Sequence, residues 1–175
     1  MTEELDRLIQ STLDEREVVY QRPQPGRFFV TLPGTKKLQT NCWLMVGAHA
    51  LVVEAFVCRK PDEAHEEVYR FLLHRNAKLY GVHYTLDQAG DIFLLGRVGL
   101  DRVTADELDR LLGQVLEAAD GDFNTLLELG FASSIRREWK WRTARGESLA
   151  NLAAFEHLLD PPDGHNGRFG AVADS

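Results

Sequence analysis

The sequence predicts an α+β domain in which an antiparallel sheet is flanked by helices. Its 175 residues, 44% of them hydrophobic, are enough for one ordinary domain with its own core. The β-rich segments come in clusters instead of alternating one by one with helices, which favours an antiparallel sheet. Two pairs of these segments are joined by short links that contain glycine, as in β-hairpins. The expected order is helix, four strands, helix, two strands and two helices.

The first helix and the first two strands follow from local patterns. Apolar side chains recur at helical spacing over residues 3–15 and predict a short amphipathic helix. Extended segments are expected at 18–20 and 27–32. The run Pro23-Gln24-Pro25-Gly26 separates them, and proline and glycine at this density favour a turn.

The next two strands form a predicted hairpin over residues 37–57, with Gly47-Ala48-His49 as its link. A turn centred on Ala48 places four large apolar side chains on one face: Trp43, Met45, Leu51 and Val53. The opposite face is also apolar, with Cys42, Leu44, Val46, Val52 and Phe56. A sheet with one solvated face normally alternates apolar and polar residues. Both faces therefore need cover, from helices of the chain, a second subunit or a captured segment.

A second helix is expected to begin at Pro61, because proline is tolerated at the first helical position. Acidic residues follow it and basic residues close the helix near Arg75, an order that complements the helix dipole. A second hairpin is expected over residues 79–98. The capping-box pattern Thr104-Ala105-Asp106-Glu107 then starts a long apolar helix, which resumes at 123–129.

The C-terminal part contains a last expected helix over residues 147–159, which a proline-rich run ends. Residues 165–175, which follow that run, are small, polar and rich in glycine, so we expect a disordered tail over 161–175. The prediction is therefore a single domain over residues 1–160.

Charge and cysteine content narrow the function classes. The net charge of −7 argues against nucleic-acid binding as a class, because phosphate neutralisation supplies most non-specific affinity. It also disfavours anionic membrane surfaces, and the sequence shows neither a signal peptide nor a membrane-spanning stretch. Cys42 and Cys58 fit no metal or redox spacing and are interpreted as reduced, buried thiols. The expected location is the cytoplasm, and no cofactor is expected.

Short catalytic motifs for phosphate binding, serine nucleophiles and zinc are missing from the sequence. One alternative is an enzyme with a site assembled from separated residues, in one form around a metal held by Asp62, His65 and Glu66. Asp62 and Glu66 would share a helix face at this spacing. The helix dipole alone also explains an acidic first turn.

The segment from Arg136 to Arg145 holds five basic residues and one acid in an otherwise acidic chain. Its candidate contact residues are Arg136, Arg137, Trp139 and Trp141. Basic side chains interleaved with tryptophan can grip single-stranded nucleic acid. They can equally form cation–π pairs within the fold or bind an acidic segment of a protein. All three interpretations remain open at this point.

Three stretches, residues 49–76, 79–101 and 104–142, resemble the YbjN family in the form met in high-GC bacteria. They begin HALVVEAFVCRK, LYGVHYTLDQAG and TADELDRLLGQV, and the likeness covers approximately residues 16–155. It implies a fold similar to that of type III secretion chaperones, with a curved antiparallel sheet and frequent dimers. The family is described as sensory transduction regulators, and the resemblance brings no catalytic residues with it.

These observations predict a non-enzymatic protein-binding module, chaperone-like or regulatory, that holds a protein or peptide on an apolar sheet surface. A homodimer that buries the patch of Trp43, Met45, Leu51 and Val53 is a second expectation, because a twofold interface uses the same surface on both subunits. The enzyme and the nucleic-acid binder are the alternatives.

Overall fold

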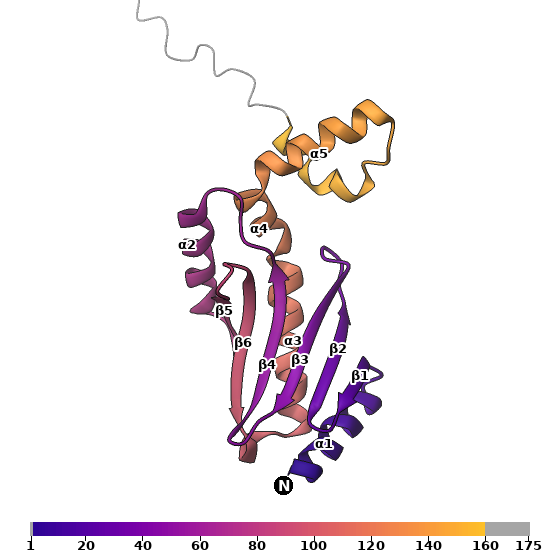
Figure 1. Ribbon diagram of the computed structural model, residues 1–175, viewed down its shortest axis with the longest axis vertical. Coiled ribbons are helices and arrows are strands. Elements are labelled where there is room, and N and C mark those ends of the chain that lie inside the picture. Colours follow the sequence, from indigo (N-terminus) through magenta and orange to yellow (C-terminus); the bar gives the residue numbers. More distant parts are fainter. Residues whose placement is uncertain (1, 160–175) are drawn as a thin grey trace, which may run out of the picture. The chain divides into compact units, whose positions relative to one another are not determined.

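The computed structural model of the chain describes residues 2–159 (Figure 1). The chain divides into two compact units, residues 1–130 and residues 131–175, and each is described by itself. The predicted single domain over residues 1–160 stays a prediction. The predicted disordered tail at 161–175 lies outside the described residues.

The first unit contains a six-stranded sheet in which every neighbouring pair of strands is antiparallel. The strand order is β1-β2-β3-β4-β6-β5. This confirms the predicted α+β class with its antiparallel sheet. In chain order the elements are α1 (Thr2–Glu15), β1 (Val19–Gln24), β2 (Arg27–Pro33), β3 (Gln39–Val46), β4 (Ala50–Cys58), α2 (His65–Asn76), β5 (His83–Leu86), β6 (Ile92–Gly99), η1 (Leu100–Arg102), α3 (Ala105–Gly121) and α4 (Phe123–Gly130).

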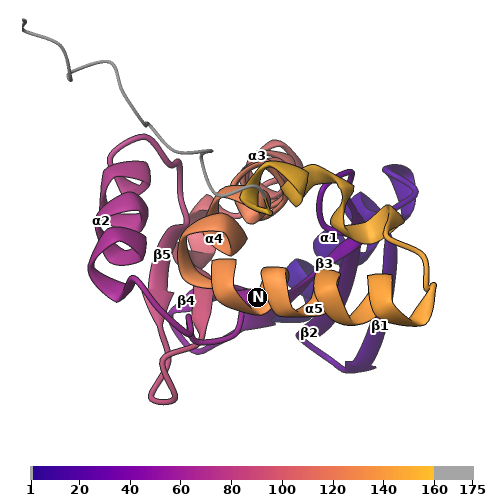
Figure 2. The same cartoon turned by 90° about the horizontal axis from the view of Figure 1, so that it is seen from above.

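Helices α1 and α3 pack together on one side of the sheet, where α3 crosses β3 and β4 (Figure 2). The core lies between these helices and the sheet, and its largest fully buried side chains include Ile9, Phe28, Leu44, Leu94 and Leu108. Each such side chain contributes about 1.5–3 kcal/mol of transfer free energy on burial. The core is therefore built on one face of the sheet.

The β3–β4 hairpin has a different register from the predicted one. Val46 is paired with Leu51, and the Gly47 N–H donates to the Ala50 carbonyl at 2.9 Å. The turn therefore has two residues, Ala48-His49, and its centre lies half a residue further along the chain than Ala48.

This small change separates the four side chains that were predicted to share one face. Leu44 is paired with Val53 and Trp43 with Glu54, so Leu51 and Val53 point into the core, where both are 0% exposed. Trp43 and Met45 are on the other face. A one-residue shift of pairing moves every side chain of a strand to the opposite face. The prediction that Trp43, Met45, Leu51 and Val53 form one surface is wrong.

Helix α2 begins at His65 and not at Pro61, since Ala64 adopts a left-handed conformation with φ of 51°. Pro61 is buried, and the next two N–H groups, of Asp62 and Glu63, donate to the Gly130 carbonyl at 2.9 and 3.2 Å. The segment before α2 is thus a loop that is fixed against the end of α4.

Half of the predicted capping box is found: the Thr104 hydroxyl accepts the Glu107 N–H at 3.1 Å, while the Glu107 carboxylate accepts the Tyr80 hydroxyl at 3.0 Å. At the other end of α3, the Asp120 carboxylate accepts three N–H groups of the β2–β3 loop, from Thr35, Lys36 and Lys37, at 2.8–2.9 Å. Burial opposes ionisation of Asp120, but these donors outweigh it and hold its pKa below the usual 3.8.

Asp6 on α1 fixes the β1–β2 hairpin in a similar way. Its carboxylate accepts the Gly26 N–H at 2.6 Å and pairs with Arg22. Burial raises the pKa of Asp6, but the Arg22 and Gly26 hydrogen bonds outweigh this, and the pKa lies below 3.8.

We predict that acid destabilises the fold through these two carboxylates. Their pKa values in the folded chain are lower than the 3.8 of the unfolded chain, so their contribution is complete above pH 3.8. It is lost as the pH falls through the lower folded values. Urea titrations between about pH 5 and pH 2 should show a falling midpoint, with a shallower fall in Asp6→Asn plus Asp120→Asn. Equal slopes in the two proteins would contradict the assignment.

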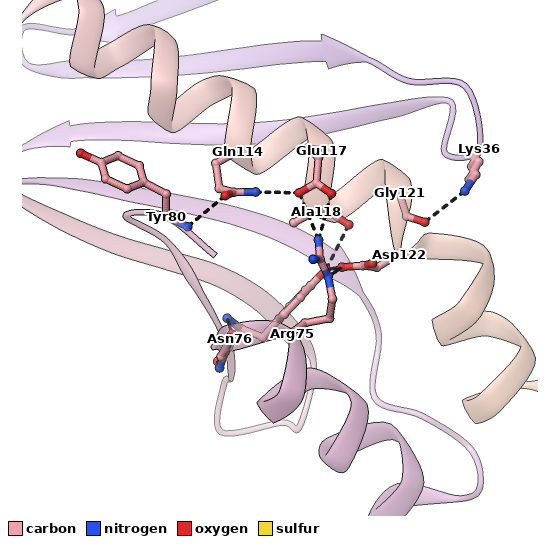
Figure 3. Close-up of polar contacts among 10 residues, drawn as sticks. Lys36, Arg75, Asn76, Tyr80, Gln114, Glu117, Ala118, Gly121 and Asp122 are labelled. Carbon is pink, nitrogen blue, oxygen red and sulfur yellow. Dashed lines mark hydrogen bonds and ion pairs between the residues drawn. The ribbon is translucent and has the colours of Figure 1, made fainter. Parts of the chain in front are cut away.

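A polar network joins α2 and β5 to α3 (Figure 3). The Arg75 guanidinium donates to Asp122 Oδ2 at 2.7 Å and to both Glu117 oxygens at 3.0 Å. The Tyr84 hydroxyl lies 2.7 Å from the same Asp122 oxygen. The hydrogen bond that Arg75 donates to Asp122 raises the pKa of Arg75, and burial raises the pKa of Tyr84, so both stay protonated. Asp122 is the shared acceptor of this network.

In the second unit, the described elements are α5 (Ala132–Arg145) and the 3-10 helix η2 (Ala150–Leu158). α5 ends at Gly146, whose φ of 66° is easily adopted only by glycine. The last helix, expected over residues 147–159, is found as η2, which is shorter and of the 3-10 type.

Candidate partner-binding site

The face of the sheet opposite α1 and α3 presents a continuous set of partly exposed side chains. We call it the open face and define it by ten residues: Arg27, Phe29, Trp43, Met45, Val52, Glu54, Phe56, Phe93, Leu95 and Arg97. Seven of the ten are apolar. Phe56 is 41% exposed, and the others are half-buried except the two exposed arginines.

Strand register arranges these side chains in rows across the sheet. One row is Arg27, Met45, Val52 and Arg97, and the next is Phe29, Trp43, Glu54 and Leu95. Phe29 and Trp43 contact each other with ring centroids 4.8 Å apart, and Phe56 and Phe93 do so at 5.4 Å. Such aromatic pairs stiffen the surface and present large rigid contact areas.

Charge on the open face is sparse. The Arg27 guanidinium lies 3.0 Å from Met45 Sδ, a weak acceptor. Within the described residues, neither Glu54 nor Arg97 forms an ion pair. At one end, Lys37 Nζ donates to the Phe56 and Val57 carbonyls, and burial lowers its pKa. The face is thus mainly apolar, with isolated charges.

Of the predicted patch, only Trp43 and Met45 belong to the open face. Sequence reasoning missed Phe29, Phe93 and Leu95. The sequence carries no alternation that marks Phe93 and Leu95, because residues 92–95 are consecutive and apolar; only the strand register places these two side chains on the open face.

Comparison with known families and proteins places the chain among bacterial relatives. The model of the YbjN family, described as "Putative bacterial sensory transduction regulator", matches residues 6–128. The chain belongs to the YbjN family. It is 60% identical to the uncharacterized protein Rv0487 of Mycobacterium tuberculosis, over 88% of this chain and 87% of that one. It is 64% identical to the uncharacterized protein ML2442 of Mycobacterium leprae, over 77% of this chain and 73% of that one.

Among solved structures, this YbjN chain is similar to one in the ExsC–ExsE complex, with a TM-score of 0.54 and 16% identity, over 72% of this chain and 96% of that chain. A chain of the HopA1–SchA chaperone–effector complex has a TM-score of 0.48 at 15% identity, over 67% of this chain and 91% of that chain. A chain of the ExoU–SpcU type III secretion complex of Pseudomonas aeruginosa has a TM-score of 0.46 at 16% identity, over 70% of this chain and 98% of that chain. The likeness to the first shows a shared fold, and the expected kind of fold is confirmed.

The alternative metal site is not assembled in this YbjN chain. Asp62 precedes α2 and pairs with Arg59 at 2.6 Å, while Glu66 pairs with Arg70 at 2.7 Å. His65 Nε2 lies 2.8 Å from the Pro61 carbonyl. The prediction that Asp62 and Glu66 share a helix face is wrong, because α2 starts after Asp62. Across residues 2–159, no group of three potential metal ligands is found.

Both cysteines of this YbjN chain are buried, as expected. Burial raises the pKa of Cys42 to about 12 and that of Cys58 to about 11. Thiols with such pKa values hold almost no thiolate at neutral pH and are poor nucleophiles. For the part of the chain that is described, no helix has the length and apolar character needed to cross a bilayer.

The basic segment forms most of α5. Arg136 Nε donates to the Leu158 carbonyl at 2.7 Å, so this side chain fastens η2 to α5. Arg137 and Trp141 line a surface hollow of about 450 Å³ on one helix face. Trp141 is 47% exposed, and the Arg145 guanidinium lies 4.5 Å from its ring. Trp139 is half-buried. The four predicted residues therefore do not form one uniform contact set.

Proposed function

We propose that this chain is a cytoplasmic, non-enzymatic protein-binding module, chaperone-like or regulatory, that holds a partner protein or peptide on the open face. The observation that carries the proposal is the open face itself, with seven apolar side chains on an uncovered side of the sheet in the first unit. Contiguous apolar surface of this kind marks interaction sites in proteins.

The residue types on the face suit protein binding. Aromatic side chains and arginine supply most binding energy at interfaces, and a few central ones dominate. Trp43 lies at the centre of the second row with Phe29 against it, which makes it the expected anchor. The family description as a regulator and the partner-bound state of the ExsC–ExsE structure also support this role.

The proposal predicts that Trp43→Ala combined with Phe93→Ala removes partner capture. The full chain is crosslinked in its native host and co-purified, and recovered proteins are quantified against wild type. Loss of two aromatic anchors should lower affinity by about 30-fold or more. Leu73→Ala is the matched control, because Leu73 is 70% exposed on α2 and lies off the open face. Equal recovery by the double variant and wild type would exclude the open face as the site.

The face of α5 that carries Arg137 and Trp141 is a second candidate contact surface, for an acidic protein segment. The observation that favours it is the exposed Trp141 with Arg145 stacked on its ring. We expect tryptophan fluorescence to change on titration with an acidic peptide, and Arg137→Glu plus Arg145→Glu to weaken binding about tenfold. Binding should also weaken as salt increases. A response to single-stranded DNA or RNA instead would favour the nucleic-acid alternative. No response to the peptide or to nucleic acid would exclude this face of α5 as a contact surface.

A further inference from the structure

Two arginines mark the ends of one row of the open face. Arg27 on β2 and Arg97 on β6 are both exposed, and Met45 and Val52 lie between them. Three strand spacings separate the two arginine backbones, which amounts to about 14 Å. Among the described residues neither guanidinium has a carboxylate partner, and that of Arg27 lies against Met45 Sδ. Both charges are thus available to a ligand that covers the row.

The Lys37 ammonium is a third cation, at the other end of β4. Its Nζ donates to the Phe56 and Val57 carbonyls at 3.0 and 2.8 Å and lies 5.4 and 5.6 Å from the ring centroids of Phe56 and Phe123. Within residues 2–159 it forms no ion pair. An ammonium has three N–H donors, so these two carbonyls leave one donor for a ligand. A half-buried cation without a carboxylate is a favourable place for an incoming acid.

The three cations stand at the margin of the apolar side chains. Phe56 is four residues along β4 from Val52, a rise of about 13 Å, so Lys37 is about as far from the arginine row as the arginines are from each other. The one acid of the open face, Glu54, lies inside this margin. Three basic groups against one acid give the surface a positive excess, in a chain whose net charge is −7. The open face therefore differs in sign from the chain as a whole.

We propose that the open face binds an apolar, acidic protein segment, whose carboxylates meet Arg27, Arg97 and Lys37 separately. This inference rests on the proposed function, because it names the chemistry of the partner at the same site. One carboxylate cannot reach two cations about 13–14 Å apart, so the segment supplies an acid to each. An extended chain rises about 3.3 Å per residue, so acids four positions apart span the two arginines. Apolar residues between the acids then cover the row that contains Trp43.

The side chains between the cations favour a protein segment over a nucleic acid. A single strand of nucleic acid binds by stacking its bases on aromatic rings between the phosphate contacts. The two side chains between the arginines are Met45 and Val52, which offer no ring for stacking. Aliphatic and aromatic side chains of a protein can pack on them and on Leu95 in the next row.

Binding of short labelled peptides to the full chain, followed by fluorescence anisotropy, tests the inference. One peptide alternates leucine and phenylalanine with glutamate, and two matched peptides carry glutamine or lysine in place of glutamate. The glutamate peptide should bind about tenfold more tightly than the glutamine peptide, and the lysine peptide should bind most weakly. The affinity of the glutamate peptide should also fall as salt increases. Equal affinities for the three peptides would overturn the inference.

Neutral substitutions locate the charges that matter. Arg27→Gln and Arg97→Gln should each lower the affinity for the glutamate peptide about fivefold, and the double variant about 25-fold, because sites this far apart act independently. Lys37→Met should also weaken binding, with its fold checked by urea denaturation. Glu54→Gln should strengthen binding about threefold, because it removes a charge of the same sign as the peptide. If Lys37→Met does not fold, the two arginine variants and Glu54→Gln decide the question.

Arg7→Gln is the matched control for the arginine variants. Arg7 is on α1, on the other side of the sheet, and its side chain is 78% exposed. It should leave the affinity unchanged. Full affinity in the double arginine variant, or tighter binding of single-stranded DNA than of the glutamate peptide, would each overturn the inference. Loss of peptide binding in Arg137→Glu plus Arg145→Glu, with none in the open-face variants, would assign the peptide to α5 and overturn it as well.

Failure of this inference and failure of the proposed function give different results. If the glutamate peptide does not bind, but Trp43→Ala plus Phe93→Ala still removes partner capture in the native host, only the acidic nature of the segment is overturned. If the peptide binds in the charge-dependent way described, but the same double variant captures partners as well as wild type, only the proposed function is overturned.

Discussion

Asp122→Ala is expected to lower the free energy of unfolding by about 3 kcal/mol, because it removes one member of a largely buried ion pair. The Asp122 side chain is 12% exposed and that of Arg75 is 21% exposed. The substitution leaves the Arg75 guanidinium without its main acceptor and the Tyr84 hydroxyl without Asp122. Urea denaturation followed by tryptophan fluorescence measures the change.

Glu117→Ala is the matched control for this substitution. Glu117 binds the same guanidinium, but its side chain is 61% exposed, so its loss should cost less than about 1 kcal/mol. Tyr84→Phe removes only the hydroxyl and should cost about 1 kcal/mol. If Asp122→Ala and Glu117→Ala had equal effects, the network would not hold α2 and β5 to α3 in the way described.

The sequence is sufficient to predict the elements that depend on local patterns. The helix at 3–15, the N-cap at Thr104 and the two hairpins follow from periodicity and turn chemistry, and all are found. Clustering of the strands was enough to predict the antiparallel sheet. These features are visible because neighbouring residues alone determine them.

Features set by distant contacts could not be read in this way. The start of α2 at His65 depends on a loop tied to Gly130, more than 60 residues away. The hairpin register depends on whether its turn has two or three residues, and Gly47-Ala48-His49 allows both. That single difference moved Leu51 and Val53 into the core and changed the composition of the candidate site.

The register of strand pairing therefore decides which side chains make up the candidate site. The sequence indicated that both faces of the β3–β4 hairpin are apolar, but which side chains meet on one face was decided by pairing across four strands. Rows such as Phe29, Trp43, Glu54 and Leu95 bring together residues up to 66 positions apart. Only knowledge of the strand order makes such a row visible.

Gly96→Ala is expected to destabilise the fold by about 3 kcal/mol or more, a value at the upper end for overpacking, because a backbone atom cannot move aside easily. A Cβ at Gly96 would lie 2.2 Å from the Gly81 carbonyl oxygen and 2.9 Å from a Val82 methyl group. The chain must pass this closely over β6 to enter β5. The open-face residues Leu95 and Arg97 flank Gly96, so the variant should also disturb the candidate site.

The same substitution at Gly113 should have the opposite effect on the free energy of unfolding. Gly113 is inside α3 and exposed, and a Cβ there meets nothing within 4 Å. Alanine should stabilise this helix by roughly 0.8–1 kcal/mol, because glycine is the poorer helix former. Urea denaturation of the two variants compares identical changes in chemistry at two sites. A loss at Gly96 of less than about 0.5 kcal/mol would mean that the strand entry relaxes freely, and that β5 is not held as closely against β6 as the glycine requires.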